Sequence, residues 1–176
     1  MVRDLGRLRD AAKDLVAVND TLTIEAALYT VSYADSEGNV NVRSQSGNHI
    51  FAPGTENEYT FTLSNTGNIA VDYITSITLD LSLGEFDDLP LKMKMTRNDG
   101  SYVFGGDGEW VSPKDLGSID EPGTLGAGRF TTYTVLWKWD FESGDDKFDT
   151  ALGSASASSD ISMSMSIGTY AEVSSK

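Results

Sequence analysis

The chain of 176 residues contains no cysteine and only one histidine, His49. The absence of cysteine excludes disulfides, thiolate metal sites and cysteine nucleophiles. A single histidine cannot supply the two histidines that a zinc peptidase helix needs. No serine lies in a G-x-S-x-G motif, so nothing marks a catalytic triad around His49. We therefore predict a protein that is not an enzyme and needs no cofactor, with His49 in a loop.

Basic residues are also scarce, since 13 lysines and arginines stand against 27 acidic residues, for a formal charge of −14. Such a charge opposes binding to nucleic acid and to anionic lipid surfaces. No segment approaches the roughly 18 consecutive apolar residues of a membrane span. We expect a secreted protein, extracellular or on the cell surface. Because Met1 is followed directly by Val-Arg-Asp, we also expect that an export signal has been removed.

The first 20 residues differ from the rest of the chain in their hydrophobic spacing. Apolar residues recur there at steps of three and four, which is the pattern of an amphipathic helix. Four of the thirteen basic residues lie in this segment: Arg3, Arg7, Arg9 and Lys13. We expect two parts, an N-terminal arm of residues 1–20, docked as a helix or as a strand, and a β domain of residues 21–176.

From Thr21 onward, apolar and polar residues alternate with the period of a half-buried strand. About nine such segments are separated by turns, which predicts an all-β fold, an antiparallel β-sandwich of the jelly-roll type. Residues 105–128 show only Trp110-Val111 as a strand, and Asp145 to Leu152 read as two helical turns that Gly153 ends. The alternation assigns twelve residues to the core: Phe61, Leu63, Val71, Tyr73, Ile77, Leu79, Leu81, Val135, Trp137, Met163, Met165 and Ile167.

Residues 51–73 read as a β-hairpin. Pro53-Gly54 is a turn pair, and the residues from Tyr59 to Ser64 then alternate between apolar and hydroxyl side chains. The sequence Asn65-Thr66-Gly67-Asn68 reverses the chain, because Asn and Gly accept positive φ. The alternation resumes at Val71, on the expected return strand.

This segment, with a second one, resembles the TasA/camelysin-type family of secreted proteins from Gram-positive bacteria. Family members carry an "aPG…ytftvkNtGn…vdY" block like the one at residues 51–73. They often also carry a W-x-W strand, an acidic loop and a D-T-x-L-G turn, similar to residues 133–142 and 149–153 here. The two blocks and their order cover roughly half of the chain.

The resemblance implies a subunit of a biofilm matrix fibre, exported through a SipW-type signal peptidase. In that family the jelly-roll subunits join head to tail when an N-terminal segment of one inserts as a strand into the next, so that backbone hydrogen bonds bridge the copies. The N-terminal residues to which we assign self-assembly are Leu5, Leu8, Leu15, Val16, Leu22 and Ile24. The alternative is that residues 1–20 form an amphipathic helix that lies on its own domain.

Two further groups of residues are candidate ligand sites. Asp145, Asp146 and Asp149 could gather a calcium ion, which prefers carboxylate oxygens, or form a solvated acidic loop. Trp110 and Trp139 could stack on sugar rings, whereas the stripe that includes Trp139 could equally fill the core of a sandwich.

Two functions from different classes follow. The first is a structural subunit of a secreted fibre, with other copies of itself as partners and, beyond these, other matrix proteins or polysaccharide. The alternative is a secreted adhesin or carbohydrate-binding β-sandwich module, which exposed aromatic residues in a row would favour.

Overall fold

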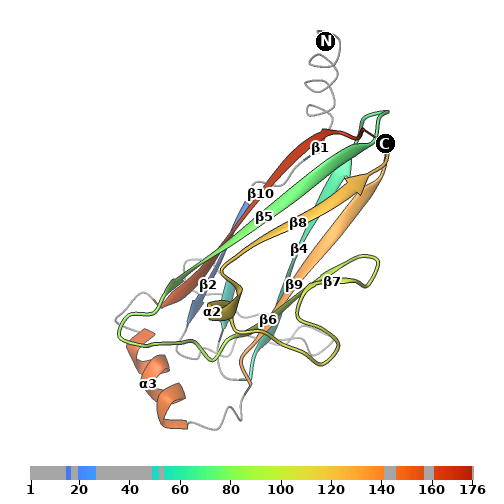
Figure 1. Cartoon of the computed structure of the whole chain (residues 1–176). Coiled ribbons are helices and arrows are strands. Elements are labelled where there is room, and N and C mark those ends of the chain that lie inside the picture. The colour runs from blue at the N-terminus through green and yellow to red at the C-terminus, as the bar shows by residue number, and fades with distance from the viewer. Residues whose placement is uncertain are drawn as a thin grey trace.

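We analysed the protein in a computed structural model, which describes residues 15–16, 20–26, 49–51, 54–140, 146–156 and 161–175. Within these ranges, ten strands form two five-stranded sheets, and the helices are α2 (Pro113–Leu116) and α3 (Asp146–Ser156), each of which lies between a strand of one sheet and a strand of the other (Figure 1). Sheet A has the spatial order β1 (Leu15–Val16), β4 (Glu56–Asn65), β9 (Phe130–Lys138), β6 (Lys92–Arg97) and β7 (Tyr102–Phe104). Sheet B has the order β3 (His49–Phe51), β2 (Asp20–Ala26), β10 (Ser162–Val173), β5 (Val71–Ser82) and β8 (Ser118–Leu125).

The predicted all-β fold is confirmed. Neighbouring strands run antiparallel in both sheets, with one parallel pair, β2 with β3. Helix α3 lies at one end of the sandwich, and β10 runs from that end to the other (Figure 1). In the part of the chain that the structure describes, no helix is long and apolar enough to cross a membrane.

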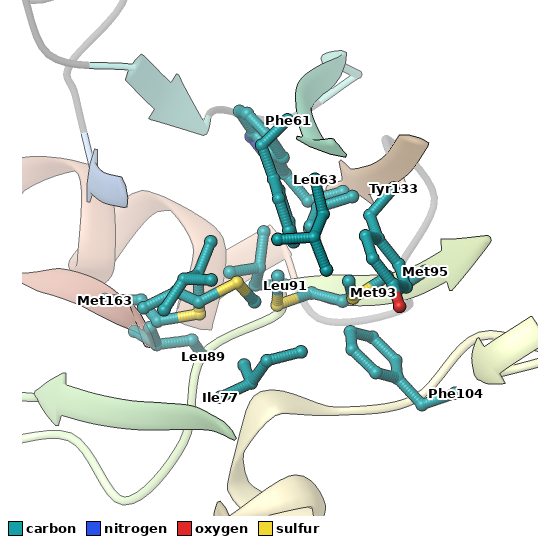
Figure 2. Close-up of a cluster of buried hydrophobic side chains, with 14 of the residues drawn as sticks. Phe61, Leu63, Ile77, Leu89, Leu91, Met93, Met95, Phe104, Tyr133 and Met163 are labelled. Carbon is teal, nitrogen blue, oxygen red and sulfur yellow. The ribbon is translucent and has the colours of Figure 1, made fainter. Parts of the chain in front are cut away.

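The core forms where the apolar faces of the two sheets meet. Ten of the twelve predicted core residues are buried, while Leu79 and Leu81 are half-buried and pack against them. Figure 2 shows side chains of both sheets in one cluster, which includes Met93 and Met95 of β6, Met163 of β10 and Ile77 of β5. Unbranched methionine side chains fill irregular space of this kind well.

Strands β4 and β5 follow each other in the chain but lie in different sheets, so the predicted hairpin is wrong. β4 pairs with β1 and β9, whereas β5 pairs with β10 and β8. Residues 66–70 therefore carry the chain from sheet A across to sheet B. Gly54 has the positive φ of 76° that its turn requires, but Gly67 lies outside the left-handed region. An alternating pattern on both sides of a turn predicts two strands without saying whether they pair.

Two other predictions along the chain are also corrected. Residues 118–125 form β8, although Pro122-Gly123 in their middle usually breaks a strand. Proline is tolerated there because β8 is an edge strand, with one neighbour only, among the described strands. Trp110-Val111, predicted as a strand, contributes a single bridge between Val111 and Met93.

Helix α3 continues past Gly153 to Ser156, so the predicted stop at that glycine is wrong as well. Leu152 is fully buried and Ala155 packs against the core. Burying one face of a helix stabilises it more than a single glycine weakens it. The edge-on contact of Phe148 with Phe86, with ring centroids 5.6 Å apart, holds the same helix against the sandwich.

Candidate functional site

The two N-terminal strands complete sheets of their own chain. β1 pairs with the last residues of β4, Leu15 with Asn65 and Val16 with Ser64. β2 lies inside sheet B between β3 and β10, where Leu22 pairs with Met165 and Ile24 with Met163.

Four of the six residues to which we assigned self-assembly thus occupy strand positions: Leu15, Val16, Leu22 and Ile24. The other two, Leu5 and Leu8, lie outside the described residues. Residues 15–16 and Asp20, which we assigned to the arm, pair within the sandwich. The β domain therefore begins before residue 21.

An ion pair links the two sheets on the side of the sandwich away from β1 and β2. Arg97 at the end of β6 pairs with Glu121 of β8, and its Nη2 donates to the carbonyl oxygen of Pro122 at 3.4 Å. These contacts place the β6–β7 edge of sheet A over the β8 edge of sheet B. The other edges of the two sheets, which β1 and the β2–β3 pair form, consequently share the N-terminal side of the sandwich.

Asn65 joins the two sheets at one end. Its side-chain amide donates to the carbonyl oxygens of Ile69, Leu125 and Gly126, at 2.8, 3.0 and 3.2 Å. Its Oδ1 accepts from the backbone N–H of Gly67 at 3.0 Å. Asn65 is only 2% exposed, so water cannot replace these hydrogen bonds. The sequence pattern predicts a turn at Asn65 but does not indicate its contacts between the sheets.

A pair of buried hydroxyl groups also crosses the core. The phenol oxygens of Tyr73, on β5, and Tyr133, on β9, lie 2.8 Å apart. Burial, together with the hydrogen bond to Tyr73, raises the pKa of Tyr133 well above its usual range. A Cβ at Gly123 would meet the ring of Tyr73, so glycine leaves the room that this ring needs. The pair therefore forms a buried hydrogen bond between the two sheets.

The structure separates the two tryptophans that we proposed for glycan stacking. Trp139 is only 1% exposed and packs in the core, so its ring cannot stack on a sugar, which corrects that assignment. Trp110 is partly exposed, and the Nζ atoms of Lys94 and Lys138 lie 4.4 and 4.7 Å from its ring centre. These cation–π contacts use the ring that a sugar would need. No row of exposed tryptophans forms among the described residues.

The candidate calcium ligands fall partly outside the described residues. Asp149 lies in α3 and is half-buried, while Asp145 and the side chain of Asp146 are not described. Within the described ranges, no three acidic or histidine side chains lie together as metal ligands would. His49 begins β3 rather than lying in a loop.

A shallow hollow of about 410 Å³ lies on the outer face of sheet B. Tyr170, Ile74 and Pro122 come from three adjacent strands and form its apolar floor, since each is paired with the next across the sheet. Asp72 and Glu172 lie at its rim, paired with each other two residues further along β5 and β10 on the same face. Tyr170 is 67% exposed and Ile74 is 43% exposed, which is unusual for apolar side chains of a sheet.

No family model and no curated protein match the chain. Among solved structures, a match is found to AvmM, described as catalysing macrocyclization in alchivemycin A biosynthesis. The two proteins are 10% identical, the match covers 72% of this chain and 66% of AvmM, and the TM-score is 0.31. So distant a likeness carries no argument about this chain.

Proposed function

We propose that the protein is a structural subunit of a secreted fibre or biofilm matrix, without enzymatic activity. Copies assemble head to tail by exchanging N-terminal strands, as in the TasA/camelysin-type family that the sequence resembles. The observation that supports this most is the origin of β1 and β2. Both come from the first 26 residues, and together they complete both sheets on one side of the sandwich.

Strand exchange would keep every backbone bond of this arrangement. If β2 of one copy paired with β10 of the next, the six residue pairs from Ser162–Glu25 to Ile167–Asp20 would simply form between chains. Because the donated strands and the receiving sheets are different surfaces, the contact is heterologous. When each copy donates its strands to one neighbour and receives those of another, the contact repeats from copy to copy and builds a filament.

The architecture is compatible with the finer parts of this proposal. Two five-stranded sheets, with a chain that passes from sheet A to sheet B between β4 and β5, suit a jelly-roll-type sandwich. We include export from the cell in the proposal, because a matrix fibre assembles outside the cell. The alternative of a carbohydrate-binding module lacks the row of exposed tryptophans that would favour it.

Engineered disulfides test the exchange directly, because the chain has no cysteine of its own. Thr23 and Ser164 are paired between β2 and β10, within the distance that a disulfide spans. Oxidised Thr23→Cys/Ser164→Cys protein should give a ladder of covalent oligomers on a non-reducing gel.

The matched control is Thr78→Cys/Ser118→Cys, which joins β5 to β8 in the same sheet. Neither of these strands is exchanged in our proposal, so this variant should cross-link only within the chain. A Thr23/Ser164 variant that also yields monomers alone, under conditions where filaments are present, would refute strand exchange.

A further inference from the structure

The outer faces of the two sheets present complementary features at the same end of the molecule. On sheet A, Phe130 is the most exposed side chain of β9, at 62%. Ser64 is paired with it, and the Thr62–Thr132 pair lies next along the strands on the same face. Val16 of β1 is paired with Ser64 on the far side from Phe130. The residues of β4 and β9 nearest to the ring are therefore small hydroxyl residues. Arg129, which precedes Phe130, is exposed and forms no ion pair with any described residue.

On sheet B, the hollow described above has the opposite character. Its floor is apolar, and the next row on one side holds Gly168, Ser76 and Asp120, with the Ser76 hydroxyl donating to the Asp120 carboxylate at 2.7 Å. The row on the other side carries Asp72 and Glu172. An aromatic ring could pack on this apolar floor, and a cation next to the ring could pair with the two carboxylates at the rim. The Asp72 carboxylate also accepts a hydrogen bond from the hydroxyl of Thr124 at 2.6 Å, which fixes its position at the rim.

We propose that the occupant of this hollow is a second copy of the chain, which inserts Phe130 between Tyr170 and Pro122 and places Arg129 against Asp72 and Glu172. The charge complementarity argues for a copy of this chain, since a molecule of charge −14 repels its like unless cations meet carboxylates at the contact. Large aromatic residues and arginine are also the residues that most often anchor interfaces.

The position of the two features determines how the contact repeats. Phe130 opens β9 just after the turn that follows β8, and the hollow lies near the end of β8. The two features thus share one end of the sandwich but face away from each other. One contact leaves a free ring on one copy and a free hollow on the other, so the contact continues from copy to copy. It would join chains side by side, in addition to the strand exchange along a fibre.

This inference depends on the proposed function in one respect, namely that copies of the chain assemble. The experiment is a charge exchange in the full-length protein, with self-association measured by sedimentation equilibrium at low salt. Arg129→Glu alone and Glu172→Arg alone should each weaken lateral self-association at least tenfold. The double variant Arg129→Glu/Glu172→Arg should recover most of that loss, because the charges face each other again with their signs reversed. Phe130→Ala should weaken association as much as either single reversal.

A matched control keeps the same charge changes away from the contact. Lys92→Glu on the outer face of sheet A and Asp80→Arg on that of sheet B should leave self-association unchanged. The inference is overturned if Arg129→Glu and Glu172→Arg behave like this control, or if the double variant associates no better than the single ones. The oxidised Thr23→Cys/Ser164→Cys ladder is measured separately. If the oxidised variant gives covalent oligomers but the charge variants all behave alike, only the lateral contact is refuted. If the charge variants behave as expected but the oxidised variant stays monomeric, only strand exchange is refuted.

Discussion

The strands of sheet B contain seven acidic residues and no lysine or arginine, whereas those of sheet A contain two acidic and four basic residues. Stacked sheets are about 10 Å apart, so the sandwich carries its charge asymmetrically across a short distance. The net charge of −14 conceals this difference. Composition alone does not reveal that all the lysines and arginines of the described strands lie in sheet A.

Three connections hold the acidic sheet B against the more basic sheet A. Asn65, the Tyr73–Tyr133 pair and the Arg97–Glu121 ion pair each link sheet A to sheet B. They differ in burial, and the cost of removing a polar partner rises with burial.

Asn65→Ala should have the largest effect, a loss of about 3 kcal/mol in the free energy of unfolding, because it leaves buried carbonyl oxygens without a donor. Denaturant titration measures this loss. Asn68→Ala is the control, since Asn68 is exposed in the same connection and should change stability by less than about 0.5 kcal/mol. Equal losses in the two variants would show that Asn65 does not join the sheets.

Alkaline pH should weaken the hydrogen bond between Tyr73 and Tyr133, the second connection between the sheets. Tyr133 has a raised pKa in the folded protein, so it stays protonated there while tyrosine in the unfolded chain ionises near pH 10. Its contribution is fully present below about pH 10 and is lost above it, at up to about 1.4 kcal/mol per pH unit. Denaturant titrations between pH 9 and 11 should show a decline that is less steep in Tyr133→Phe. An identical decline in both proteins would contradict this assignment.

The inner and outer faces of the strands could be predicted from the sequence, but the partners of the strands could not. The alternation from Thr131 to Trp139 identified the buried side of β9, because side-chain direction has a period of two. Pairing depends on contacts far apart in the chain, which a local pattern does not contain. The turn at Asn65 therefore looked like that of a hairpin, although Asn65 contacts Leu125 and Gly126, about sixty residues away.

The candidate sites show the same limit. Trp110 and Trp139 are alike as sequence features, yet one lies beside two lysines and the other in the core. The hollow on sheet B needs Tyr170, Ile74 and Pro122 side by side, and nothing in the sequence aligns these strands. Proline in β8 even argued against a strand there. Only the register of three strands brings the hollow together.

The third link, between Arg97 and Glu121, should contribute less than the first two. Both side chains are partly exposed, at 25% and 16%, so solvent screens the pair. A double-mutant cycle with Arg97→Gln and Glu121→Gln should give a coupling of about 1 kcal/mol. The same cycle on Lys138 and Asp140, whose carboxylate is 55% exposed, should give a smaller value. A larger coupling in the second pair would contradict the link between sheets.

The smallest effect tests the charge asymmetry itself, with one substitution of the same kind on each outer face. Asp80→Lys places a cation in a sheet whose strands hold only acidic charges, and should raise the free energy of unfolding by about 0.5 kcal/mol at low salt. Glu56→Lys adds the same charge on sheet A, but Glu56 is paired with Lys138, which in turn is paired with Lys92. A row of three lysines across adjacent strands should lower stability by about 0.5 kcal/mol. The two variants should converge as salt is added, because exposed charges are screened. If both substitutions stabilise the protein equally, net charge alone governs its electrostatics and the difference between the sheets has no energetic consequence.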